Sequence, residues 1–232
     1  MTVDDTPGPG PATENGTAND AGPGTRTVLD LADWRRRVAE LYADVRRSAD
    51  PEAGHARWRA GRDALFREHP QSPLAPDDLL RETGLPYAGY DPAWRFEVTL
   101  DAAPATAPLH LSTGADGVTS LLRVGRVHLP APFDGDLDVW WLAQYGGGIF
   151  LPLRDGTSGR TSYGGGRYLL DTAKGADLGT GGVASRSSGE MVLDLNFLYH
   201  PSCRYDPRWV CPLAPAGNRT DVDVPVGERL AP

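Results

Sequence analysis

The feature that most constrains the fold of this chain is a change in the spacing of its apolar residues near residue 90. From Trp94 to Leu100 every second residue is apolar, which is typical of a strand with one covered face. Turn signals such as Gly146–Gly148 then separate further short apolar runs. The sequence predicts these strands at Leu109–Leu111, Val118–Val124, Arg126–Leu129, Leu137–Ala143, Ile149–Leu153, Arg167–Leu170 and Met191–Tyr199.

The residues before the strands have helical spacing instead. Apolar residues from Leu31 to Val45 recur every three or four positions, and Asp30 is the predicted N-cap. A second helix is expected to start at Asp50 and Pro51, because Asp caps helices and Pro is tolerated in the first turn. Its expected buried side chains are Trp58, Leu65 and Phe66.

These two patterns together predict an α+β fold that is mainly β. Short, closely spaced strands favour an antiparallel β-meander that forms a sandwich or partly closed barrel, here with an N-terminal helical hairpin. A parallel nucleotide-binding sheet is disfavoured, because its crossovers need helices between the strands.

The first 27 residues are rich in Pro, Gly, Thr and Asp and nearly free of large apolar side chains. Such a segment buries too little surface to offset the entropy of ordering, so residues 1–27 are predicted to be a disordered acidic tail. Residues 28–232 are expected to form a single domain, with a helical part at 28–84 and a β part at 85–232.

The net charge of −8 argues against nucleic acid as a partner, since nucleic-acid binders carry a concentrated basic face. No apolar run is long enough to cross a bilayer, and the N-terminus lacks the pattern of a secretory signal, so we expect no membrane partner and a cytoplasmic location. The near absence of lysine, with Lys174 the one example, suggests a high-GC bacterial genome.

The loop from Asp155 to Tyr168 places polar and glycine residues where a plain sheet needs strand formers. Backbone N–H groups of Gly164–Gly166 could approach an anion, and Arg167 or Arg160 could clamp a carboxylate or phosphate. A glycine-rich turn with a surface arginine is the alternative. The loop differs from a phosphate-binding loop of nucleotide hydrolases, because a strand and not a helix follows it.

Two polar residues alternate with apolar ones in the predicted strand Met191–Tyr199. Asp194 and Asn196 are expected to share one face of it. On a solvated edge this pairing has no function, whereas beside a cavity the two side chains would orient a ligand.

His200, Cys203 and Cys211 are residue types that bind zinc. A fourth ligand would have to come from Asp194, Asp206 or Glu228. Three states of the cysteines stay open: reduced structural thiols, a local disulfide across the loop, and metal ligation, and thiol catalysis would need a partner such as His200.

A set of ordered motifs from about Trp34 to Glu228 resembles the bacterial and archaeal domain of unknown function family numbered 1684. One departure is His200, where the family carries Asn before the proline. The resemblance implies no activity. The motifs are Ser72–Leu74, Tyr90–Asp91, Asp155–Leu169, Asp194–Asn196, Pro201–Tyr205, Cys211–Asn218 and Gly227–Glu228.

The leading hypothesis is a small-molecule enzyme or ligand-binding domain with a polar site in the C-terminal half, with an anionic ligand as one candidate. Asp194 or Tyr163 would transfer protons, and the cofactor is unknown. The candidate ligand-binding residues are Asp155, Thr157, Thr161, Arg167, Asn196 and Asn218. The alternatives are a structural or protein-interaction module, in which Arg167 pairs with Asp194, and a zinc-dependent hydrolase.

Overall fold

The structure is a computed structural model that describes residues 24–102, 108–112, 117–179 and 189–231. Two long helices, α1 (Thr25–Arg47) and α2 (Pro51–Glu68), form a hairpin, and the short α3 (Leu80–Thr83) follows. Strands make up most of the rest. Their bounds are β1 (Arg95–Thr99), β2 (Asp101–Ala102), β3 (Leu109–Ser112), β4 (Val118–Leu129), β5 (Gly135–Leu142), β6 (Ile149–Leu153), β7 (Arg167–Asp171) and β8 (Glu190–Asp194).

The strands form two antiparallel sheets. A six-stranded sheet has the order β2-β4-β5-β6-β7, with β3 also paired to β4, and a second sheet consists of β1 and β8. From β4 to β7 neighbours in the sheet are also neighbours in the chain, as expected for a meander. The sheets pack as a sandwich-like arrangement and do not close into a barrel, so the predicted mixed, mainly β fold is confirmed.

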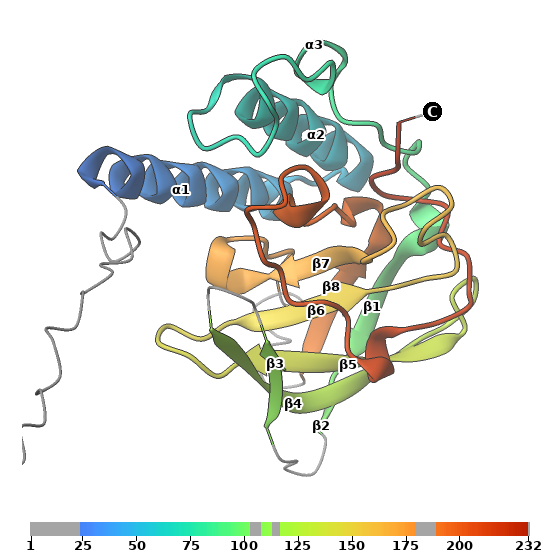
Figure 1. Ribbon diagram of the computed structural model, residues 1–232. Helices are drawn as coiled ribbons and strands as arrows, with labels where there is room; N and C mark the ends of the chain where they lie inside the picture. Colours follow the sequence, from blue (N-terminus) through green and yellow to red (C-terminus); the bar gives the residue numbers. More distant parts are fainter. Residues whose placement is uncertain (1–23, 103–107, 113–116, 180–188, 232) are drawn as a thin grey trace, which may run out of the picture.

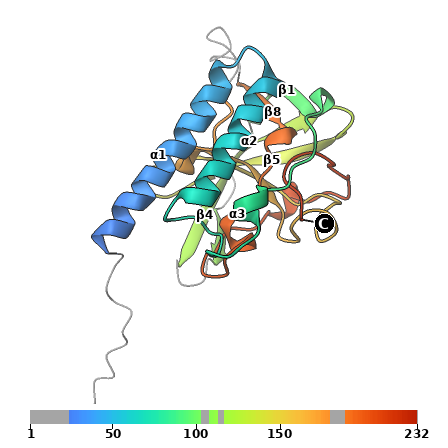
Figure 2. The same cartoon turned by 90° about the horizontal axis from the view of Figure 1, so that it is seen from above.

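The helical hairpin lies over the β part, with β7 near the helices and β4 and β2 on the far side (Figure 1). Seen from above, α1 and α2 run side by side across the strands (Figure 2). One buried apolar cluster joins all these layers, from Tyr42 on α1 and Trp58 on α2 to Phe197 and Leu193. The hairpin is therefore part of the same core as the sheets.

Several predicted boundaries need correction. Helix α1 begins at Thr25 and not after Asp30, and Gly24 at its N-cap position provides no side-chain hydrogen bond. Helix α2 begins as predicted, because the Asp50 carboxylate accepts hydrogen bonds from the backbone N–H groups of Glu52 and Ala53. The rest of the predicted tail, residues 1–23, lies outside the described residues.

In the β part, the two strands predicted between Val118 and Leu129 are one strand with an irregular register between Arg123 and Gly125. The predicted strand Met191–Tyr199 ends at Asp194, where a turn of 3-10 helix follows. Among the described residues no helix is both long enough and apolar enough to cross a membrane.

Candidate functional site

The loop between β6 and β7 is held by a buried ion pair between Asp155 and Arg167. Only 1% of the Arg167 side chain is exposed, and its Nη2 lies 2.7 Å from Asp155 Oδ2. The other Asp155 oxygen accepts hydrogen bonds from the backbone and hydroxyl of Thr157. The remaining acceptors for Arg167 are the backbone carbonyls of Val224, Val226 and Glu228.

This arrangement uses the loop's most specialised side chain for internal contacts. The Arg167 amino groups face Asp155 and the C-terminal segment. The sequence instead predicts that they bind an anion or pair with Asp194. Gly166 permits the entry into β7, since its φ of 92° is unfavourable for other residues and a Cβ there would lie 2.7 Å from the carbonyl oxygen of Leu153. Thr161 and Arg160 are exposed, and Arg160 pairs with the exposed Asp223.

Asp194 and Asn196 come together, but through a turn and not on one strand face. The backbone and side-chain N–H groups of Asn196 donate to Asp194 Oδ1 at 3.1 and 2.8 Å. The Tyr90 hydroxyl donates to the other Asp194 oxygen at 3.0 Å. Burial raises the pKa of Asp194, while these hydrogen bonds lower it.

The other predicted ligand-binding amide, Asn218, lies apart from both groups. Its side chain accepts a hydrogen bond from Trp140 Nε1 at 2.7 Å and donates to the carbonyl oxygen of Asp138 at 2.8 Å. Apart from the exposed Thr161, the predicted ligand-binding residues therefore lie in separate buried networks and are not gathered around one opening.

His200, Cys203 and Cys211 lie near one another, yet no group of three His, Cys, Asp or Glu among the described residues is arranged to hold a metal ion. His200 Nε2 is occupied, because it accepts a hydrogen bond from the backbone N–H of Tyr163 at 3.1 Å. Burial and nearby arginines lower the pKa of His200 to about 2, which keeps the imidazole neutral. Both cysteines are free thiols.

Glu228, considered in the sequence only as a metal ligand, is fully buried beneath the helical hairpin. Its Oε2 accepts hydrogen bonds from Arg62 Nη2 at 3.1 Å and from the backbone N–H of His200 at 2.8 Å. Tyr87 and Tyr205 also donate their hydroxyls to this carboxylate. Burial raises the pKa of Glu228, and the Arg62 guanidinium opposes that shift.

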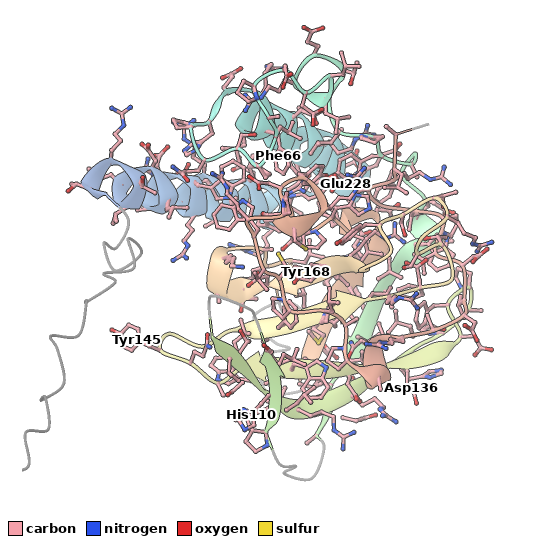
Figure 3. The ribbon with its side chains drawn as sticks, viewed as in Figure 1. Phe66, His110, Asp136, Tyr145, Tyr168 and Glu228 are labelled. Atoms are coloured by element: carbon pink, nitrogen blue, oxygen red, sulfur yellow. The ribbon has the colours of Figure 1, made fainter. Side chains whose placement is uncertain are left out.

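A cavity of about 90 Å³ lies beside this cluster, between the hairpin and β7. Trp34, Val38 and Tyr42 line it from α1, since residues four positions apart share a helix face, and Arg62 and Phe66 line it from α2. Figure 3 marks the two sides, with Phe66 on α2 above Tyr168 on β7. The other lining residues are Asp171, Lys174, Ala176, Tyr199, His200, Pro201, Ser202 and Cys211.

Three polar atoms of lining residues are buried without a hydrogen-bond partner among the residues that the structure describes. They are Tyr42 Oη, Arg62 Nε and Asp171 Oδ1. The residues Tyr42 and Asp171 are 2% and 3% exposed. Burial raises the pKa of Tyr42, which keeps its hydroxyl protonated and able to donate. Because buried polar atoms are nearly always paired, these three unpaired atoms set the residues around this cavity apart.

Sequence reasoning missed these residues, although two of them carried a usable signal. Tyr42 continues the stripe of Trp34 and Val38 by one further turn, and Asp171 follows the predicted strand Arg167–Leu170 directly. Arg62 had no such signal, because it is one of many arginines on the hairpin.

The comparisons with known proteins identify the family. The model of the family described as "Protein of unknown function (DUF1684)" matches residues 82–229. The chain belongs to this family. The predicted resemblance is thus confirmed, although the match begins at residue 82 and not near Trp34.

A solved relative supports the assignment of this DUF1684 protein. The solution NMR structure of an uncharacterized protein of Haloarcula marismortui is 32% identical, with a TM-score of 0.51. The alignment covers 74% of this chain and 90% of the Haloarcula marismortui chain. The search of curated proteins found no match.

Proposed function

We propose that this DUF1684 protein binds a small polar molecule in the cavity between the helical hairpin and β7. The observation that supports the proposal is that three residues lining this cavity, Tyr42, Arg62 and Asp171, each carry a buried polar atom without a partner among the described residues. A buried polar atom that loses water and gains no partner costs roughly 1–3 kcal/mol, so a guest that satisfies all three recovers several such costs.

The lining chemistry specifies what such a guest must carry. Arg62 Nε–H needs an acceptor, Asp171 Oδ1 needs a donor, and the Tyr42 hydroxyl serves either role. Lys174, whose Nζ lies 3.5 Å from Asp171 Oδ2, adds a second positive charge at the rim. A small hydroxy acid or amino acid meets these needs, with its carboxylate on Arg62 and its hydroxyl or ammonium group on Asp171.

The size of the cavity limits the guest to a few heavy atoms. Its volume of about 90 Å³ is well below the roughly 300–1,000 Å³ of sites for drug-sized ligands. Aromatic rings of Trp34, Phe66 and Tyr168 supply apolar walls for a short carbon chain. An anionic ligand, predicted for the loop at Arg167, is now proposed for Arg62 and Lys174.

A structural role is the second candidate for the motif residues themselves. It is favoured by the internal partners of Asp155, Arg167 and Asn218, which hold these three side chains in contacts within the protein. A zinc-dependent hydrolase has no support in the geometry. Cytoplasmic residence, a bacterial source, a single domain and the absence of nucleic-acid partners stay predictions.

The test is a thermal-shift screen of small hydroxy acids, amino acids, polyols and metal ions against the purified chain. A ligand at 100 times its Kd adds about 2.7 kcal/mol to the free energy of unfolding. Tyr42→Phe removes one unpartnered hydroxyl, so the free variant should be about as stable as the wild type while its ligand affinity falls about fivefold. Asp171→Asn should weaken binding in the same way.

Ser158→Ala is the matched control, because Ser158 Oγ is also buried without a partner among the described residues but does not line the cavity. A ligand that raises the unfolding temperature of Tyr42→Phe and Asp171→Asn as much as that of the wild type binds elsewhere and contradicts the proposal. Silence across the whole screen favours the structural or protein-interaction alternative.

A further inference from the structure

A second groove lies where α2, the segment around α3 and the C-terminal part of the chain meet. Its volume of about 720 Å³ is within the roughly 300–1,000 Å³ typical of small-molecule sites. It shares no lining residue with the cavity between the hairpin and β7. Its lining includes Arg59, Asp78, Leu79, Leu80, Leu85, Pro86, Tyr87, Arg204 and Tyr205.

Two tyrosines of this lining are anchored to the buried Glu228. The Tyr87 hydroxyl donates to Glu228 Oε2 at 3.4 Å, and the Tyr205 hydroxyl donates to the other oxygen of the same carboxylate. Because both hydroxyls meet one carboxylate, the two rings are held close together. Both tyrosines are only half-buried, so part of each side chain stays accessible.

A guanidinium group lies over each of these two rings. Arg59 Cζ is 5.0 Å from the centre of the Tyr87 ring, and Arg204 Cζ is 5.7 Å from the centre of the Tyr205 ring. In the part of the chain that the structure describes, neither arginine side chain forms a salt bridge or a hydrogen bond. Attraction between a cation and a ring occupies no N–H donor, so both guanidiniums keep their donors for an anion.

The rest of the lining is mainly apolar. Leu79, Leu80, Leu85 and Pro86 contribute aliphatic side chains, and Leu79 is 74% exposed. The acidic residue of the described lining is Asp78, whose Oδ1 accepts a hydrogen bond from the backbone N–H of Leu80 at 2.9 Å. Two arginines and one aspartate leave the lining with one net positive charge, which a singly charged anion neutralises.

We propose that this groove binds an apolar monocarboxylate, with the carboxylate on Arg59 and Arg204 and the hydrocarbon body against the leucines. Arginine suits this role, because its planar N–H groups can donate two parallel hydrogen bonds to one carboxylate. Asp78 disfavours anions of higher charge by repulsion. The proposal does not depend on the polar guest proposed above, because the two sites have no residue in common.

Isothermal titration calorimetry of the full-length protein with octanoate tests the proposal. Octanoate should bind, and octanamide, which has the same chain and no charge, should bind at least about tenfold more weakly. Acetate, which has the charge but almost no apolar surface, should give no measurable binding. Arg59→Ala and Arg204→Ala should each weaken octanoate binding about tenfold, because each removes a charged donor.

Arg208→Ala is the matched control. Arg208 Cζ also lies over a ring, 5.2 Å from the centre of Trp209, but this arginine pairs with Asp206 and does not line the groove. The variant has the same net charge as the two test variants and should bind octanoate like the wild type. Tyr42→Phe should also bind octanoate normally, because Tyr42 lines the other cavity.

Leu79→Ser tests the apolar wall, since this exposed leucine can be replaced with little effect on folding, and it should weaken octanoate binding. Circular dichroism establishes that each variant is folded. The proposal is overturned if the folded wild type does not bind octanoate, if it binds octanamide equally well, or if both test variants bind octanoate as tightly as Arg208→Ala. Should the arginine variants fail to fold, octanamide and Leu79→Ser decide, and unchanged affinity in either comparison refutes the proposal.

Discussion

At the scale of single residues, the most specialised side chains of this protein face inward. Arg167 is the clearest case, because a fully charged guanidinium is buried against Asp155 and three backbone carbonyls. A buried pair adds little net stability over apolar packing, but removing one partner leaves the other charge unpaired. Arg167 therefore fixes how the β6–β7 loop and the C-terminal segment meet.

Arg167→Ala should lower the free energy of unfolding by about 3–5 kcal/mol, because it leaves the Asp155 carboxylate buried without its charge partner. Urea denaturation measures the change. Arg160→Ala in the same loop is the control, and it should cost no more than about 1 kcal/mol because its pair with Asp223 is exposed. Equal effects of the two substitutions would contradict this role for Arg167.

His200 links stability to pH. Its pKa is lowered from 6.5 to about 2 in the folded chain by burial and by Arg167, Arg204 and Arg62. Below pH 6.5 the unfolded state therefore binds a proton that the folded state does not bind. The contribution of His200 to the free energy of unfolding falls as the pH drops from 6.5 towards 2, and it is constant above pH 6.5. Glu228 acts in the opposite direction, because its folded pKa is raised.

His200→Gln should remove the contribution of this histidine and leave that of Glu228. Between about pH 7.5 and about pH 5.5 the wild type should lose about 1.4 kcal/mol more than the variant. Denaturation curves at the two pH values measure this difference. Parallel losses in both proteins would show that His200 does not titrate differently in the folded and unfolded states.

At the scale of elements, local signals predicted the start of α2 but not that of α1. Asp50 and Pro51 fixed the start of α2 because capping depends on neighbours in the chain. The alternation in Met191–Tyr199 was misleading, because the Asp194 carboxylate accepts from the backbone of Asn196 and turns the chain into a 3-10 helix. A turn in which an Asp side chain accepts from the backbone N–H two residues later can replace a strand, and alternation alone does not show which of the two forms.

The candidate site was harder to predict than the elements. The helical stripe that contains Trp34 and Val38 is visible in the sequence, but nothing in it tells which turn faces β7. Tyr42, Arg62 and Asp171 come from three elements, and only the tertiary packing of the hairpin brings them together. Polar motifs at Asp155 and Arg167 looked functional because buried ion pairs and binding sites use the same residue types.

At the scale of the whole molecule, one core joins the hairpin to both sheets. Trp58 of α2 is 2% exposed and packs its ring against Tyr42, Tyr87 and Phe197. Because these contacts cross from the helical part to the β part, we propose that the two parts unfold together.

Trp58→Ala should therefore lower the stability of the entire chain by about 3–5 kcal/mol, in one transition. Hydrogen exchange should show protection lost together in α2 and β5. Trp141→Ala is the control, since Trp141 is 40% exposed and its loss should matter much less. Selective loss of protection in α2 would contradict a single cooperative unit.

The burial of Glu228 has a consequence for the order in which this chain can fold during its synthesis. Arg62, Tyr87 and the backbone of His200 all meet this carboxylate, which is translated long after the hairpin. Domains whose contacts join distant parts of the chain fold slowly, because those contacts form only after a large loop has closed. The hairpin thus emerges from the ribosome well before Glu228, the partner of its Arg62, and this face of the hairpin stays exposed to solvent until Glu228 has been translated.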